Sequence, residues 1–127
     1  NNNAPPSLAA AFGMLPANLI DKDTMLQTLH KIRYTWRWNT AWGWDFPMCA
    51  MSAARLGELE LAVDFLMMEE VKNTYLPNGH NYQHAALTAY LPGNGGLLTA
   101  VAMMASKWGF PKNGQWKVQV ENIHPLL

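Results

Sequence analysis

The sequence has little cysteine, little charge and no long apolar run. Its single cysteine, Cys49, excludes an internal disulfide and a zinc site built from cysteines. Charged residues make up only 14% of the 127 residues, and nine basic side chains balance nine acidic ones. A basic surface for nucleic acid is therefore not expected. No apolar run approaches the roughly 20 residues that cross a bilayer, so we expect no membrane span.

Apolar residues, in contrast, make up half of the chain and include six tryptophans and eight methionines. A chain of this length fits one ordinary domain and can bury a core. Its sparse polar cover favours one of two situations, a large contact with another chain or membership of a larger fold.

Apolar periodicity predicts helices over most of the chain. An Ala-rich stretch at 7–15 predicts a short helix, and Asp21 or Asp23 can cap a second helix that ends near Arg33 or Tyr34. The segments 48–56 and 58–68 predict two helices joined at Gly57, which gives an αα-hairpin. We expect the second of these helices to face inward with Leu59, Ala62, Val63, Leu66 and Met67.

The remaining segments lack this pattern or change it. Residues 71–93 predict a long polar loop, and 97–107 predict an apolar helix that is buried on most sides. Alternation over 116–121 predicts one strand. We therefore expect a helical portion at 1–112 and a strand-like tail at 113–127.

Three stretches resemble a known group of enzymes. Residues 40–45 (TAWGWD), followed by 54–57 (ARLG), resemble the penultimate hairpin of the six-hairpin glycosidases. Residues 91–96 (LPGNGG) resemble the "IDGNFGG" segment that opens the last inner helix in glycoside hydrolase family 95. The family 65 phosphorylases have similar barrels.

The resemblance implies an all-α fold of antiparallel helical hairpins, here the last part of an (α/α)6 toroid, with one C-terminal β-strand added. Enzymes of this fold act on glycosidic bonds with two carboxyl groups. The family's base corresponds to Pro92 in this sequence, and the general acid comes from an earlier part of the barrel. The expected partners are carbohydrate and either upstream helices of the same domain or a second copy. The analogy also implies a periplasmic or secreted location. We expect no metal and no cofactor.

Asp45 is the best candidate for catalytic chemistry. It lies between Trp44 and Phe46, and an aromatic environment would raise the pKa of its carboxyl group and suit it to acid or base work. Alternatively, Asp45 caps the helix that begins near Pro47. The two roles are compatible.

Neutral polar and aromatic side chains form the candidate sugar site. Flat tryptophan faces pack on pyranose rings, and Trp42 and Trp44 are the first choices, with Trp36 and Trp38 behind them. At least half of the four would serve only as core. The expected hydrogen-bonding contacts with sugar hydroxyls are His80, Asn81, Gln83 and Asn94.

Other readings of these segments remain open. His80 and His84 lie four residues apart, but no third ligand is near, so a metal is a minority interpretation. Residues 93–96 could hold an anion, although close backbone packing explains Gly95 and Gly96 more simply. For the whole chain, a glycoside hydrolase portion competes with a non-catalytic carbohydrate-binding or assembly module. An unrelated all-α domain with a tryptophan core is the third alternative.

Overall fold

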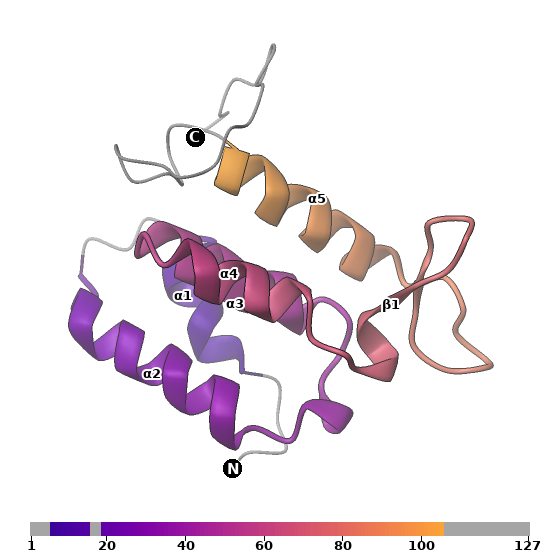
Figure 1. The fold of residues 1–127 in the computed structure, drawn as a ribbon, viewed down its shortest axis with the longest axis horizontal. Coiled ribbons are helices and arrows are strands. Elements are labelled where there is room, and N and C mark those ends of the chain that lie inside the picture. The colour runs from indigo at the N-terminus through magenta and orange to yellow at the C-terminus, as the bar shows by residue number, and fades with distance from the viewer. Residues whose placement is uncertain (1–5, 16–18, 106–127) are drawn as a thin grey trace.

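The computed structural model describes residues 6–15 and 19–105, and this part is mostly helical with a small two-stranded antiparallel sheet. The predicted strand at 116–121 and the predicted tail at 113–127 lie outside the described residues. In chain order the elements are η1 (Ser7–Ala9), α1 (Ala10–Gly13), α2 (Lys22–Thr35), η2 (Trp38–Thr40), α3 (Asp45–Arg55), α4 (Leu59–Leu66), η3 (Val71–Asn73), β1 (Thr74–Tyr75), β2 (Asn81–Tyr82) and α5 (Leu91–Ala105) (Figure 1).

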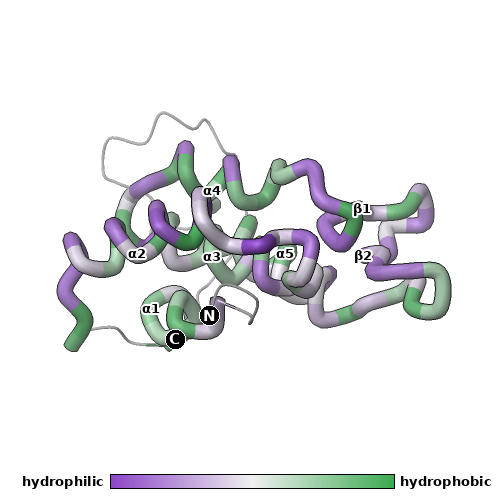
Figure 2. The backbone as a smooth tube through the Cα atoms, turned by 90° about the horizontal axis from the view of Figure 1, so that it is seen from below, coloured by the Kyte–Doolittle hydropathy of each residue, from purple (hydrophilic) through white to green (hydrophobic). Residues whose placement is uncertain are grey.

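Helix α3 forms the centre of the molecule. All residues from Asp45 to Ala54 are buried, because α3 packs against α1, α4 and α5 and touches α2. Small residues permit this crowding. The Ser52 hydroxyl donates to the backbone carbonyl of Ala9, and a Cβ on Gly13 would lie 2.7 Å from that hydroxyl oxygen. Figure 2 shows α3 in the middle, with α2 on one side and the β1–β2 hairpin at the other end.

The two helices predicted on either side of Gly57 are present as α3 and α4 and pack against each other, and Gly57 lies between them with a φ of +82°. The buried face of α4 differs from the prediction. Leu59 and Ala62 are buried as expected, but Phe65 replaces Leu66 in the core, and Met67 is 72% exposed. Phe65 packs 5.7 Å, centroid to centroid, from Trp38. Because Phe65 is buried against Trp38, the buried face of α4 does not include Met67.

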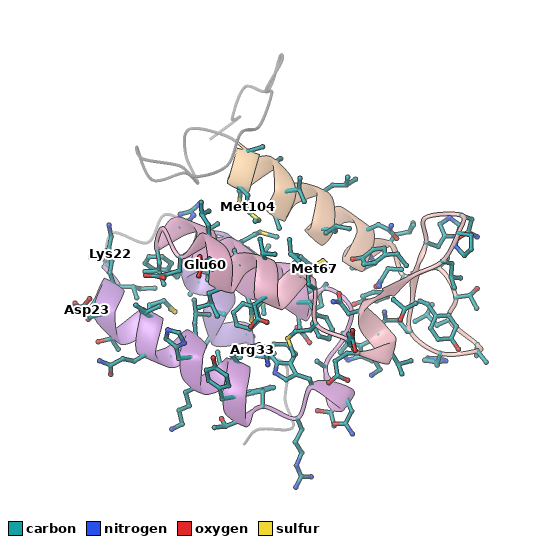
Figure 3. The ribbon with its side chains drawn as sticks, viewed as in Figure 1. Lys22, Asp23, Arg33, Glu60, Met67 and Met104 are labelled. Atoms are coloured by element: carbon teal, nitrogen blue, oxygen red, sulfur yellow. The ribbon has the colours of Figure 1, made fainter. Side chains whose placement is uncertain are left out.

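Helix α2 confirms the expectation from its periodicity. The Asp21 carboxylate accepts a hydrogen bond of 2.8 Å from the Thr24 backbone N–H, so Asp21 is the cap. Arg33, which Figure 3 labels, donates two hydrogen bonds to the Asp64 carboxylate and thereby ties α2 to α4. The Nη2–Oδ1 distance is 3.0 Å.

Residues 71–93 are more ordered than a long loop. Strands β1 and β2 pair antiparallel, with Thr74 opposite Tyr82 and Tyr75 opposite Asn81. The Gly79 N–H donates to the Leu76 carbonyl at 2.7 Å, as expected for a turn at Asn78-Gly79. The hairpin lies at one end of the molecule, beside the start of α5 (Figure 1).

Helix α5 departs from the sequence prediction in two ways. It begins at Leu91 rather than Leu97, so the glycine run lies inside its first turns. It is also buried on one side only: Met104 faces the other helices (Figure 3), whereas Leu98 is 72% exposed and Leu91 is 67% exposed. Within the described ranges, no helix has both the length and the apolarity to cross a membrane.

Candidate functional site

Asp45 lies at the first position of α3 and is fully buried. Its Oδ2 accepts a hydrogen bond of 2.7 Å from the backbone N–H of Trp42, three residues earlier. Its Oδ1 is buried and has no hydrogen-bond partner among the described residues. The helix thus starts two residues before Pro47, and the Asp45 side chain closes the turn before the helix instead of capping from outside it.

The environment of Asp45 favours its protonated form. Burial raises the pKa of the carboxyl group to about 6, while the hydrogen bond from Trp42 and the positive charge of Lys72 oppose that rise. A carboxyl group with this pKa exchanges protons readily near neutral pH, as acid–base catalysis requires. The direction of this change agrees with the sequence prediction, and its cause is burial.

Trp42 is the aromatic side chain that reaches the surface beside Asp45. Its side chain is 37% exposed, and the Lys72 ammonium lies 4.6 Å from the centroid of its ring. Tyr90 packs 5.7 Å from the same ring, centroid to centroid. Burial, and then the charge of Asp45, raise the pKa of Tyr90. Lys72 and Tyr90 therefore both contact the Trp42 ring and lie close enough to the Asp45 carboxyl group to interact with its charge.

The other tryptophans serve the core to different degrees. Trp38 is buried and stacks 5.0 Å from Phe46, and its indole N–H donates to the Arg33 carbonyl at 3.1 Å. Trp36 and Trp44 are partly buried and pack against the same core. Trp42 is thus the best placed of the four to meet a ligand.

Gln83 and Asn81 join the tryptophan-rich segment to the hairpin. The Gly43 N–H donates to Gln83 Oε1 at 2.9 Å, and Gln83 Nε2 donates to Asn81 Oδ1 at 2.8 Å. Both amide groups also donate to the carbonyl of Lys72, at 3.0 Å from Gln83 and 3.1 Å from Asn81. These hydrogen bonds bring the two distant segments into direct contact, and a sugar-sized hollow between them stays a prediction.

These two side chains do not, however, face a ligand. Gln83 is 1% exposed and Asn81 is 0% exposed, and protein partners take up both groups of each amide. Direct contact of Asn81 and Gln83 with sugar stays a prediction, and in this structure both amide groups bond to other parts of the chain. Their role here is to position Lys72, whose backbone carbonyl they hold.

Asn94 lies in α5, and His80 lies in the turn of the β1–β2 hairpin. Asn94 Oδ1 accepts from the Asn81 N–H at 3.0 Å, and its Nδ2 donates to the Gly79 carbonyl at 2.7 Å, which fixes the hairpin on α5. His80 is exposed near the turn of the hairpin, where its backbone N–H donates to Asn78 Oδ1. Contact of either side chain with sugar stays a prediction.

Two glycines allow the hairpin to approach so closely. A Cβ on Gly43 would lie 1.9 Å from Asn81 Oδ1, and a Cβ on Gly93 would lie 2.0 Å from the same atom. Asn81 is thus enclosed between the tryptophan-rich segment and α5. Sequence reasoning missed Gly43, Lys72 and Tyr90, because their roles depend on contacts between distant segments.

A metal centre has no basis in the described part of the chain, where no group of three or more His, Cys, Asp or Glu side chains could hold an ion. Cys49 is buried one turn after Asp45, and burial raises the pKa of its thiol well above the ordinary value. It is therefore an inert core thiol.

Comparison of the chain with protein-family models, with curated proteins and with solved structures gives no match. The functional argument therefore depends on the site itself: a buried carboxyl group with a raised pKa next to a partly exposed indole ring.

Proposed function

We propose that this chain is part of a carbohydrate-active enzyme, a glycoside hydrolase whose acid–base chemistry uses Asp45. The observation that carries the proposal is the pairing of a buried carboxyl group, with a pKa of about 6, and the exposed ring of Trp42. Indole rings stack on the apolar faces of sugars, and a carboxyl group that exchanges protons near neutral pH suits cleavage of a glycosidic bond.

Asp45 would exchange a proton through Oδ1, because Oδ2 already accepts a hydrogen bond from Trp42. The carboxyl group is buried, so a ligand reaches it only when neighbouring side chains move aside. Asp45 would act either as the acid for the leaving oxygen or as the base for water. The second carboxyl group would lie outside this chain, on helices of an (α/α)6 toroid.

The exposed side of α5 supports a place in a larger helical assembly. Leu91, Leu98 and Val101 are 67%, 72% and 48% exposed, and an apolar helix face of this kind is normally covered. Upstream helices of the same domain or a second copy would cover it.

The test is hydrolysis of a panel of nitrophenyl glycosides and oligosaccharides by the polypeptide that carries these residues together with its upstream helices. Asp45→Asn should lower turnover at least about 100-fold, the usual contribution of an acid–base group. Asp23→Asn, on exposed residue 23 of α2, is the control and should keep full turnover. Equal turnover in both variants would remove Asp45 from the mechanism.

A non-catalytic carbohydrate-binding or assembly module is the second candidate. Asp45 is the only buried carboxyl group among the described residues, and Pro92 occupies the position of the family's base. A module of this kind would quench or shift the Trp42 fluorescence with oligosaccharides, and Asp45→Asn would leave the affinity unchanged.

A further inference from the structure

A second surface feature lies outside the candidate site. Residues 66–71 and 73–75 line an open groove of about 550 Å³ that runs from the end of α4 to β1. That volume lies within the range of ordinary ligand sites, roughly 300–1,000 Å³. All the residues that line the groove belong to one short segment of the chain, and the structure describes each of them.

Apolar side chains lie open to solvent in this groove. Met67, at the C-terminal end of α4 (Figure 3), is 72% exposed, and Val71 is 66% exposed. Leu66 and Met68 extend the apolar wall and are partly buried against the core. Exposed methionine adapts its shape to different apolar partners and is common at peptide-binding surfaces.

The charge of the groove is negative. Glu69 and Glu70 line it, and the one salt bridge in the described part of the chain joins Arg33 to Asp64. Both carboxylates are therefore without an ion-pair partner there. Lys72 does not line the groove, and its ammonium group instead lies over the Trp42 ring. A cationic ligand thus meets two carboxylates that no described cation neutralises.

The wall of the groove is fixed by internal hydrogen bonds. Asn73 Nδ2 donates to the carbonyls of Leu66 and Met68, both at 3.0 Å, and clamps the end of α4. The Tyr75 hydroxyl donates to the Gly93 carbonyl at 3.3 Å and attaches the far side to α5. A wall that is already ordered lowers the entropy cost of binding.

We propose that this groove binds a peptide segment that presents apolar side chains next to lysine or arginine. The apolar side chains would pack on Met67 and Val71, and the cations would pair with Glu69 and Glu70. A neutral sugar would leave the charges of both carboxylates unpaired, and an anionic lipid surface is repelled by them. This inference does not depend on the proposed glycosidase function.

The experiment is fluorescence anisotropy of a labelled hexapeptide that alternates lysine and leucine, titrated with the full chain. We expect saturable binding that weakens with added salt. Peptides with glutamate in place of lysine, or serine in place of leucine, should bind at least about tenfold more weakly, because each loses one half of the complementarity.

Variants locate the binding on the chain. Glu69→Lys and Met67→Gln each change an exposed side chain of the groove, and each should weaken binding about tenfold or more. Glu60→Lys is the matched control, since Glu60 is an exposed residue on α4 that does not line the groove (Figure 3), and it should leave the affinity unchanged. Circular dichroism checks that each variant is folded.

Three results would overturn the proposal. The first is the absence of saturable binding, and the second is equal weakening by Glu60→Lys and Glu69→Lys, which would show general charge attraction. The third is stronger binding of the chain to vesicles of anionic phospholipid than to the hexapeptide.

Discussion

At the scale of a single residue, Asn81 connects three parts of the molecule. Its amide group holds the Lys72 carbonyl, its backbone N–H is held by Asn94, and glycines from two other segments leave room for its side chain. The surroundings of Asp45 therefore depend on residues that never touch the carboxyl group. Small backbone changes around Asn81 should therefore lower the stability of the whole β1–β2 hairpin.

Gly93→Ala tests this close approach. In an open helix, alanine is more stable than glycine by about 1 kcal/mol, but the new Cβ at position 93 would meet Asn81 Oδ1 at 2.0 Å. We expect the clash to prevail and to destabilise the protein by about 1–3 kcal/mol. Gly95→Ala is the control in the same helix, because nothing lies within 4 Å of its Cβ, and it should stabilise the protein by about 0.5–1 kcal/mol. Urea unfolding measures both, and a stabilised Gly93→Ala variant would contradict the structure.

The raised pKa of Asp45 predicts a loss of stability as the pH rises. In the unfolded chain this carboxyl group titrates near pH 4, and in the folded chain near pH 6. Between these values the folded state binds more protons, so the free energy of unfolding falls as pH increases and the loss is complete above about pH 7. We expect a decrease of about 2 kcal/mol between pH 4.5 and 7.5.

Asp45→Asn removes this titration because an amide group does not ionise in this pH range. The amide oxygen can still accept the hydrogen bond from Trp42. Denaturant unfolding across that pH range should show the decrease in the original chain and a flat profile in the variant. Asp64 gives the opposite trend, because its ion pair with Arg33 lowers the pKa of its carboxyl group and stabilises the fold above the ordinary pKa. Identical pH profiles with and without the Asp45 carboxyl group would rule out its burial as a destabilising charge.

At the scale of elements, the α3–α4 hairpin depends on a backbone conformation that side chains disfavour. Gly57 has a φ of +82°, and no atom lies within 4 Å of a Cβ built on it. Gly57→Ala should therefore destabilise the protein by about 1 kcal/mol through strain alone. Gly57→Asn should cost less, because asparagine tolerates the left-handed region better than alanine does. Thermal unfolding orders the three proteins, and an alanine variant as stable as the glycine chain would show that the turn changes conformation.

The elements that sequence analysis predicted well are those with strong local signals. Helix α2 has a capping aspartate and three buried side chains at helical spacing, Met25, Leu29 and Ile32. The β1–β2 hairpin was missed because strands of two residues are too short to show alternation. The start of α5 was missed because Pro92 and the glycines after it argue locally against a helix, whereas packing over the start of α3 stabilises one.

The candidate site divides in the same way. Asp45 and Trp42 were predictable, since aromatic neighbours and a helix start are visible in the local sequence. Lys72 and Tyr90 were not, because the chain brings them to Trp42 only when the hairpin folds back. Asn81 and Gln83 were predicted to contact sugar because their side chains are polar. The sequence could not show that these side chains already form hydrogen bonds with the protein backbone.

At the scale of the whole molecule, the exposed side of α5 predicts association. Leu91, Leu98 and Val101 present apolar surface on one helix, and burial of such side chains contributes roughly 1.5–3 kcal/mol each. We expect this chain by itself to form dimers or larger species at micromolar concentration, in the absence of the helices proposed to cover α5. Sedimentation velocity measures the distribution of species.

Leu98→Lys should shift that distribution to the monomer, because a charge at the centre of the exposed face must be desolvated on association. Tyr34→Lys is the matched control: Tyr34 is 74% exposed on α2, and the same charge there should leave the association unchanged. If both variants behave alike, or if the original chain is monomeric at every concentration, α5 is not the contact surface. The proposed place of this chain within a larger helical assembly would then lose its main structural support, and the two-carboxylate mechanism would lose the helices proposed to carry its second carboxyl group. The burial of Asp45 and its raised pKa would be unaffected.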